Sequence, residues 1–241
     1  MIERDGEASA TAAGIRPKGS DGEDIHVAPP NPCDGELADI LSRAAALDPA
    51  EDASAGRVID GDHALNPHLT PAADEPPPRD AAVLLALTAG EDGALSLVFT
   101  ERAAHLPAHP GQVALPGGKI EKGETPRDAA LREAFEEIAL PTDALQVIGR
   151  ADHYVTRTGF RVVPVLALVR RKALLVPDPG EVSSVFVAPW RHVMSVANQR
   201  QVAVSHNGTT RRFYEIMYRD RRIWGVTAGI LRAVNERLRR E

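Results

Sequence analysis

The chain has 241 residues, of which 43% are apolar and 26% charged, with a formal net charge of −6 at pH 7. It is long enough to bury a full hydrophobic core, and its apolar runs are far shorter than the roughly 20 residues that a membrane-spanning helix needs. A single cysteine, Cys33, excludes an internal disulfide framework and a cysteine-cluster metal site. The N-terminus is acidic and without an apolar core, unlike a secretory or transit peptide, so we expect a cytoplasmic protein.

Charge and proline are distributed unevenly along the chain. Residues 1–80 contain 17 acidic and 6 basic side chains and 10 of the 19 prolines, whereas residues 81–241 contain 17 acidic and 22 basic side chains. We predict a largely flexible acidic, Pro- and Ala-rich N-terminal arm over residues 1–80 and one domain over residues 81–241. Apolar residues at helical spacing predict a docking helix over 34–48 within the arm. The arm either competes with an anionic substrate or is simply solvated.

From residue 81 onward, β-rich runs alternate with helical patterns. Helices are predicted from residue 126, over 190–199 and over 226–240. Strands are predicted over 81–90, 94–102, 112–116, 143–155, 160–170, 181–189 and 211–219. The order predicts one mixed sheet with helices packed against it, an α/β or α+β sandwich.

The helix that begins near Pro126 has a clear start signal. Thr125 is a suitable N-cap, Pro126 fits the first helical position, and Asp128 follows Thr125 as in a capping box. At about 100° per residue, Glu133, Glu136 and Glu137 fall on one side of this helix. We expect the core-facing stripe to contain Leu131, Ala134, Phe135 and Ile138, with the small Ala129 and Ala130 leaving room beside the glutamates.

Carboxylates placed so close together repel one another unless a cation neutralises them. Mg²⁺ and Mn²⁺ prefer carboxylate oxygens and often bind substrate phosphates as well. The preceding loop, LPGGKIEKGE, contains Gly117, Gly118 and Gly123, which allow the backbone to approach a ligand closely. A run of glutamates taken alone is usually a solvated helix face, but together with this loop it favours a metal site that binds phosphate.

This stretch resembles the Nudix box, a motif of fixed spacing. The matching residues are Gly118, Glu124, Arg132, Glu133, Ala134, Glu136, Glu137 and Leu140. One departure is Ala139, where the family usually has glycine; since this position ends the helix, we expect altered loop geometry and unchanged chemistry.

The resemblance implies a Nudix α/β/α sandwich and hydrolysis of a diphosphate linked to another group. It implies that Glu133, Glu136 and Glu137 hold Mg²⁺ or Mn²⁺ with the Gly118 carbonyl, and that Arg132 and Glu124 pair to join loop and helix. The catalytic base is either Glu133 or a downstream carboxylate, for which Glu181 is the candidate; a plain strand-edge role for Glu181 is equally open.

Residues 97–118 resemble the additional motif of the coenzyme A pyrophosphatase subfamily. The matching residues are Thr100, Arg102, Leu106, His109, Gly111, Gln112, Pro116, Gly117 and Gly118, while Pro107 replaces an expected arginine. Further similarity at 154–165 and 223–231 extends the resemblance over roughly residues 81–239. It implies cleavage of coenzyme A or its derivatives to 3′,5′-ADP and 4′-phosphopantetheine.

Coenzyme A has several phosphates, so its site should gather cationic and donor groups. The candidates for substrate binding are Arg102, His109, Gln112, Arg157 and Arg161, each of which also has a purely structural interpretation. Basic residues are scattered, which does not favour nucleic acid as a partner, and a homodimer is expected from the resemblance. Other diphosphates remain as alternatives, namely ADP-ribose, dinucleoside polyphosphates and nucleoside triphosphates, as does a non-catalytic ligand-sensing module.

Overall fold

The structure is a computed structural model that describes residues 25–31, 33–44, 47–48, 58–67, 76–90, 92–206 and 209–239. Within these residues, nine strands form one mixed sheet. They are β2 (Val58–Gly61), β3 (Arg79–Ala89), β4 (Leu95–Arg102), β5 (Val113–Ala114), β6 (Gly117–Lys119), β7 (Leu145–Arg150), β8 (His153–Val155), β9 (Phe160–Val169) and β11 (Val182–Pro189).

The middle of this sheet is the parallel pair of β3 and β9. Antiparallel β4 and β11 continue the sheet on one side, and β8 and β2 continue it on the other. Strands β5, β6 and β7 pair with β4, β3 and β9 outside this path. Most of β3 and nearly all of β9 is buried, as expected for apolar strands covered on both faces.

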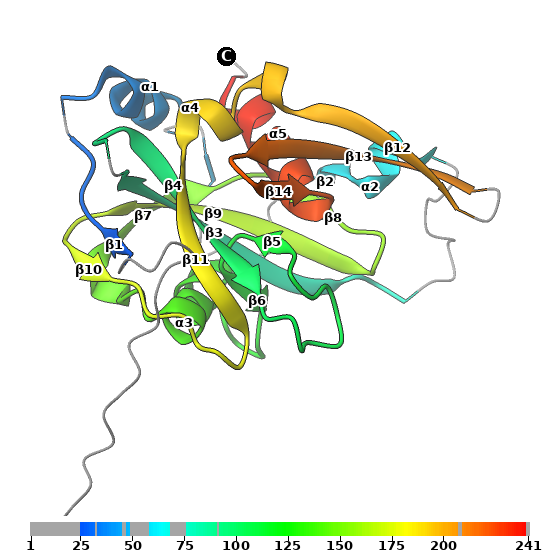
Figure 1. The fold of residues 1–241 in the computed structure, drawn as a ribbon, viewed down its shortest axis with the longest axis horizontal. Helices are drawn as coiled ribbons and strands as arrows, with labels where there is room; N and C mark the ends of the chain where they lie inside the picture. Colours follow the sequence, from blue (N-terminus) through cyan, green and yellow to red (C-terminus); the bar gives the residue numbers. More distant parts are fainter. Residues whose placement is uncertain are drawn as a thin grey trace, which may run out of the picture.

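Helices cover the two faces of the sheet unequally (Figure 1). Helix α3 (Pro126–Ile138) packs on one face, where its small residues meet Ala82, Leu84 and Val165 in one core cluster. The other face is covered by α1 (Gly35–Ala44), α4 (Trp190–Val193) and α5 (Val226–Leu238), which share a second core cluster. The predicted sandwich of helices about a mixed sheet is therefore confirmed.

Two smaller sheets complete the described structure. Strands β12 (Arg200–His206), β13 (Thr209–Tyr218) and β14 (Arg221–Trp224) form an antiparallel sheet that extends to the right in Figure 1. Strand β1 (His26–Val27) pairs with β10 (Ala173–Leu174). Short helical turns are α2 (Asp62–Leu65) and the 3-10 helices Thr142–Ala144 and Val196–Asn198.

Several predicted elements differ in extent from the observed ones. The run 143–155 is divided into β7 and β8, because the sheet requires its two halves to pair at different places along β9. The helix predicted over 190–199 is limited to α4 and the following 3-10 turn, where Ser195 and Val196 have lower helix propensities than Ala or Leu. Strands β6, β12 and β14 were not predicted from the sequence.

The core-facing side of α3 also differs from the predicted stripe. Ala129, Ala130, Ala134 and Ile138 are fully buried, whereas Phe135 is 55% exposed and points away from the core. The prediction assumed that the largest apolar residues face the sheet. Instead α3 lies against β3 and β6 through its alanines, which permit a close approach. The room expected beside Ala129 and Ala130 is therefore occupied by the sheet.

The described parts of residues 1–80 contribute to the fold. Helix α1 lies within the predicted range 34–48 and buries Leu37, Ile40 and Ala44. Strand β2 joins the main sheet through a parallel pair with β8, and β1 pairs with β10. Residues 1–24, 32, 45–46, 49–57 and 68–75 of the predicted arm lie outside the described residues. The division into an arm and a domain stays a prediction, and β3 begins at Arg79, two residues before the predicted boundary.

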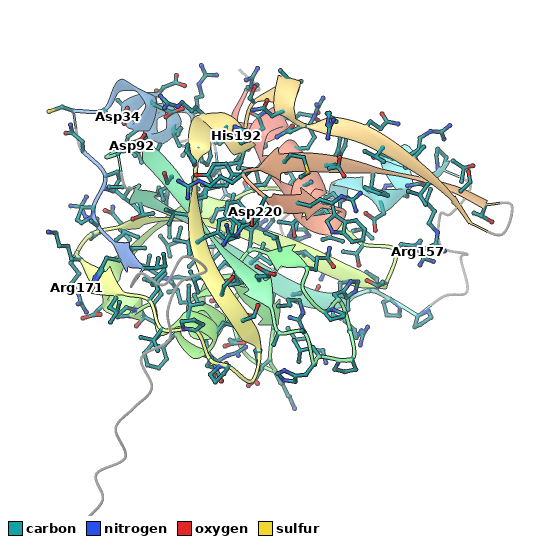
Figure 2. All side chains as sticks on the ribbon, viewed as in Figure 1. Asp34, Asp92, Arg157, Arg171, His192 and Asp220 are labelled. Carbon is teal, nitrogen blue, oxygen red and sulfur yellow. The ribbon has the colours of Figure 1, made fainter. Side chains whose placement is uncertain are left out.

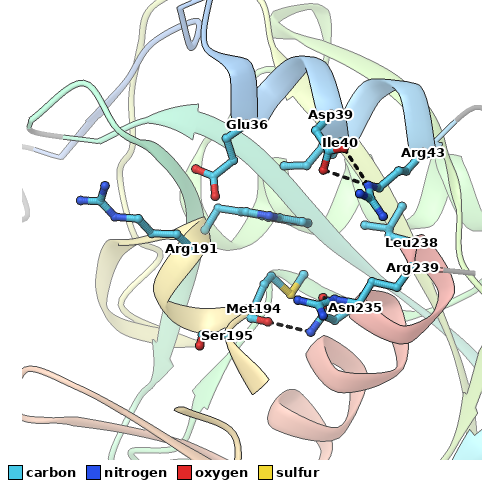
Figure 3. Close-up of a pocket in the computed structure, with 11 residues that line it drawn as sticks. Glu36, Asp39, Ile40, Arg43, Arg191, Met194, Ser195, Asn235, Leu238 and Arg239 are labelled. Atoms are coloured by element: carbon cyan, nitrogen blue, oxygen red, sulfur yellow. Dashed lines mark hydrogen bonds and ion pairs between the residues drawn. The ribbon is translucent and has the colours of Figure 1, made fainter. Parts of the chain in front are cut away.

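A cavity of about 500 Å³ lies between α1, α4 and α5 (Figure 3). Two of the arginines that line it form bonds within their own helices. Arg43 forms an ion pair with Asp39 at 2.8 Å, and Arg239 donates a hydrogen bond to Asn235 at 3.0 Å. Among the described helices, none is long and apolar enough to cross a membrane.

Candidate active site

The Gly117–Gly118 strand β6 lies directly beside the glutamate side of α3. A Cβ placed on Gly118 would be 2.3 Å from Oε1 of Glu133, and one on Gly117 would be 2.3 Å from the carbonyl oxygen of Ala82. Both distances are far below ordinary contact, so the backbone approaches closely only because these residues lack side chains. The paired glycines therefore let β6 lie close to β3 on one side and to the Glu133 carboxylate on the other.

Glu137 is the most deeply buried of the glutamates in the motif, with 5% of its surface exposed. Its Oε2 accepts a hydrogen bond from the Gly117 N–H at 3.2 Å. Burial raises the pKa of Glu137 to about 8, and the nearby carboxylates of Glu133 and Glu181 act in the same direction. Burial likewise raises the pKa of Glu133. The site thus disfavours negative charge on these two groups in the absence of a cation.

Helix α3 begins as the sequence predicts. The Thr125 hydroxyl accepts from the Asp128 N–H at 3.1 Å and donates to the Asp128 carboxylate at 2.7 Å. The cap satisfies a free N–H of the first turn and so fixes where the helix begins. At the other end, Ala139 adopts a left-handed conformation with φ 53°.

Arg132 connects the loop before α3 to the glutamate side of the helix. Its guanidinium donates to Glu124 at 2.7 and 3.1 Å and to the Lys119 carbonyl at 3.1 Å. It also donates to Glu133 at 3.0 Å and to Glu136 at 2.9 Å. The hydrogen bond from Arg132 lowers the pKa of Glu124, and the same partners raise the pKa of Arg132. The paired geometry expected for Arg132 and Glu124 is present.

Glu136 does not join Glu133 and Glu137 in one group. Its side chain is 54% exposed and its carboxylate is held by Arg132. Within the described part of the chain, no three histidine, cysteine or acidic side chains are gathered as metal ligands. One guanidinium nitrogen of Arg132 donates to both Glu133 and Glu136, so Arg132 bridges these two carboxylates at the exposed edge of the site.

Glu181 and Arg102 approach this site from β11 and β4. Glu181 is exposed just before β11, and its charge contributes to the raised pKa values of Glu133 and Glu137. Arg102, at the end of β4, opposes the raised pKa of Glu137 and donates to the Ala108 carbonyl at 3.4 Å. The structure therefore brings both within electrostatic range of the buried carboxylates.

A pocket of about 250 Å³ opens beside Gly117 and Gly118. Three of the five residues predicted to bind substrate line it, namely Arg102, His109 and Gln112. Its remaining walls are mainly apolar, and they include Ala81, Val83, Leu115, Val162, Val226 and Ile230. The pocket thus combines a few polar side chains with mainly apolar walls, which is typical of small-molecule sites.

The other two predicted substrate residues lie outside this pocket. Arg161 forms a two-pronged ion pair with Asp80 at 2.6 and 2.9 Å, and this pairing raises its pKa. Because side chains alternate along a strand, the neighbours of Arg161, Phe160 and Val162, face the pocket while Arg161 faces the opposite side. Arg157 is exposed at the edge of the molecule (Figure 2).

Sequence reasoning missed several residues that line the pocket. They are Thr156 and Thr158 from the turn between β8 and β9, and Thr227 from α5. The run YVTRTGF contains the first two, but these threonines were not singled out beside the arginine. Thr227 donates to the Val113 carbonyl at 3.0 Å and so joins α5 to β5.

Similarity to known proteins identifies the family of this chain. Residues 77–213 match the model of the NUDIX domain. The chain is 37% identical over 161 residues to "Nudix hydrolase 15, mitochondrial" of Arabidopsis thaliana, covering 64% of this chain and only 56% of that protein. It is 36% identical over 155 residues to "Uncharacterized Nudix hydrolase NudL" of an Enterobacter strain, covering 64% and 80%.

Among solved structures, the chain is similar to RenU, a Nudix hydrolase from M. smegmatis, with 26% identity, a TM-score of 0.42 and coverage of 49% and 75%. The domain match spans more than half of the chain and includes every residue of the motif around α3. The chain therefore belongs to the Nudix family of hydrolases.

Proposed function

We propose that this protein hydrolyses the diphosphate of coenzyme A or its derivatives, releasing 3′,5′-ADP and the corresponding 4′-phosphopantetheine. The observation that supports this most directly is the position of the pocket. Arg102, His109 and Gln112, which belong to the coenzyme A-type motif, line a pocket that opens beside the Gly117–Gly118 strand. A substrate that places its diphosphate at β6 would thus extend its organic part into an apolar interior.

The site fits a divalent cation such as Mg²⁺ or Mn²⁺. Glu133 and Glu137 present carboxylates to the backbone of β6 in surroundings that disfavour uncompensated negative charge. These two residues would hold the ion with the Gly118 carbonyl, and Glu136 would join them on release from Arg132. When bound, the ion neutralises diphosphate charge and acidifies water.

The chain's own residues supply position and charge. Arg102 lies near Glu137 and would bind the diphosphate, because its guanidinium presents a planar set of donors to phosphate oxygens. His109 and Gln112 would orient the substrate from the pocket wall. The ion pair of Arg132 with Glu124 fixes the loop before α3 to the helix, and Arg132 also positions Glu133 and Glu136. These two residues would thus affect catalysis by positioning the glutamates.

Two carboxylates remain candidates for the catalytic base. Glu133 is half-buried and burial raises its pKa, which makes it a better proton acceptor than an exposed carboxylate. Glu181 is exposed and lies within electrostatic range of Glu133 and Glu137. Comparing the pH–rate profiles of Glu133→Gln and Glu181→Gln would identify the base, since only its loss removes the acidic limb.

The proposal is tested by mass spectrometry of the products formed from coenzyme A with Mg²⁺ or Mn²⁺. We expect 3′,5′-ADP and 4′-phosphopantetheine, and a kcat/KM above those for ADP-ribose, dinucleoside polyphosphates and nucleoside triphosphates. A preference for ADP-ribose would overturn the choice of substrate and retain the hydrolase. Failure to cleave any diphosphate would favour a ligand-sensing module.

Two further expectations accompany this proposal. A homodimer and a cytoplasmic location both stay predictions, and a relative from Arabidopsis thaliana is named as mitochondrial. Sedimentation of the full chain and fractionation of its native cell would test them.

A further inference from the structure

The segment Val58–Pro67 precedes the family-matched region, yet it is built into the sheet beside the pocket. Gly61 in β2 pairs with Val155 in β8, and a Cβ on Gly61 would be 2.4 Å from the Val155 carbonyl oxygen. Only glycine permits this approach. The segment is therefore held against the start of the turn that connects β8 to β9.

Asp62, the next residue, uses both carboxylate oxygens to hold this region. Oδ1 accepts from the Tyr154 hydroxyl at 2.9 Å, and Oδ2 accepts from the Arg157 N–H at 2.9 Å. The Tyr154 hydroxyl in turn lies against Gly229 of α5, where a Cβ would be 2.3 Å away. Asp62 thus joins α5, β8 and the following turn through one side chain.

The turn held by Asp62 forms part of the pocket wall. Thr156 and Thr158 line the pocket, and their hydroxyls are 3.0 Å apart. The Thr156 hydroxyl also accepts from the Phe160 N–H at 3.0 Å, and Phe160 lines the pocket too. Arg157 lies between the two threonines, so its N–H is the point at which Asp62 fixes the turn from outside.

We propose that Asp62 is a positioning residue for substrate binding, which holds the Thr156–Gly159 turn in the shape that the pocket requires. The inference rests on the proposed function, because the pocket is taken as the substrate site. The inference assigns a role in substrate affinity to the segment Val58–Pro67, which precedes the catalytic motif in the sequence. Asp62 itself is not placed in contact with substrate.

A matched control exists at the other end of the same segment. Asn66 is buried, donates to the Arg212 carbonyl at 2.8 Å and accepts from the Arg212 N–H at 2.7 Å. These bonds fasten the segment to β13, and the Asn66 amide also donates to the Asp62 main-chain carbonyl at 2.8 Å. Asn66→Ala therefore loosens the segment while leaving both partners of the Asp62 carboxylate, the Tyr154 hydroxyl and the Arg157 N–H, in place.

The test compares Asp62→Asn, Asp62→Ala and Asn66→Ala in the full chain with coenzyme A as substrate. We expect KM to rise about tenfold in Asp62→Ala and by less in Asp62→Asn. The kcat should stay within about twofold of the wild-type value, because the turn binds the substrate equally strongly in the ground state and in the transition state. Removing a negative charge favours an anionic substrate, so a higher KM in Asp62→Asn cannot come from charge. Asn66→Ala should leave KM unchanged.

Amide hydrogen exchange provides a readout that needs no turnover. Residues 156–159 should exchange faster in Asp62→Asn than in the wild type or in Asn66→Ala. If the wild type cleaves coenzyme A and the Asp62 variants keep its KM, the inference fails and the proposed function stands. If the wild type cleaves no diphosphate, the proposed function fails, and unchanged exchange in Asp62→Asn would overturn the positioning role as well.

Should the Asp62 variants not fold, Tyr154→Phe removes the hydrogen bond from the Tyr154 hydroxyl to Asp62 and keeps the aromatic ring. It should raise KM about two- to threefold, since a single net hydrogen bond contributes roughly 1 kcal/mol or less. A Tyr154→Phe enzyme with wild-type KM and wild-type exchange at 156–159 would contradict the proposal.

Discussion

The Glu133 carboxylate lies directly against the Cα of Gly118, so a single methyl group at position 118 would meet Oε1 at 2.3 Å. We predict that Gly118→Ala lowers kcat about 100-fold or more, because displacing a catalytic group by about 1 Å has an effect of this size. The fold should persist, since the collision is with the end of a side chain. Gly35→Ala, where a Cβ meets nothing within 4 Å, is the matched control and should retain full kcat.

Removing the buried carboxylate should separate catalysis from folding. Glu137→Gln keeps the shape of the side chain and its hydrogen bond from the Gly117 N–H, and it removes the negative charge. We expect kcat with Mg²⁺ to fall about 100-fold or more, with an unchanged circular dichroism spectrum. A fully active Glu137→Gln enzyme would refute the proposed role of this residue.

The raised pKa of Glu137 predicts how the stability of the metal-free protein depends on pH. The pKa is about 8 in the folded protein and 4.5 in the reference state, so the folded state binds the proton more tightly. This group therefore favours folding at low pH, and that contribution is lost as pH rises through the interval between the two values, by at most about 1.4 kcal/mol per pH unit.

Urea unfolding in EDTA at several pH values would measure this effect. In Glu137→Gln the unfolding free energy should fall less steeply as pH rises, and this variant should be more stable than the wild type near pH 8. Saturating Mg²⁺ should restore wild-type stability there, because an ion competes with the proton for the same carboxylate. An identical pH profile for the two proteins would contradict the assignment.

The Arg132–Glu124 pair should contribute to both stability and turnover. Arg132→Lys cannot reproduce the separate bonds to Glu124, Glu133 and Glu136, because lysine presents a single ammonium group. We expect a loss of kcat in Arg132→Lys and in Glu124→Gln. A double-mutant cycle on unfolding free energy should give a coupling of about 1–3 kcal/mol; additive effects would show that the bonds are unimportant.

Ala139 offers a change expected to stabilise the protein. It ends α3 with φ 53°, a conformation that costs an L-residue about 1 kcal/mol or more and costs glycine nothing. Ala139→Gly should therefore raise the unfolding free energy by up to about 1 kcal/mol, less the greater flexibility of the unfolded glycine chain. The kcat should stay within about twofold of the wild-type value, because position 139 is not in contact with the substrate and changes at independent sites affect one another little. A melting temperature of Ala139→Gly below that of the wild type would show that the left-handed backbone of Ala139 causes no strain in the native protein.

Local signals allowed much of this protein to be predicted. The cap at Thr125, the start of α3 and the strands β3, β4, β9 and β11 depend on neighbouring residues and on regular spacing, and the structure contains them. The rotation of α3 could not be predicted, because it depends on how closely alanines let the helix approach β3 and β6. For the same reason Phe135, a strong apolar signal in sequence, is exposed.

The sequence by itself determined the Nudix motif and the side of one helix on which its glutamates lie, because helical spacing is a local property. Only the tertiary structure decided which of those carboxylates are buried, that Arg132 bridges Glu133 and Glu136, and that the Asp62 carboxylate bonds Tyr154, 92 residues later in the chain. These outcomes depend on contacts between segments that are distant in the sequence. Close packing and the desolvation of charged groups determine the strength of such contacts.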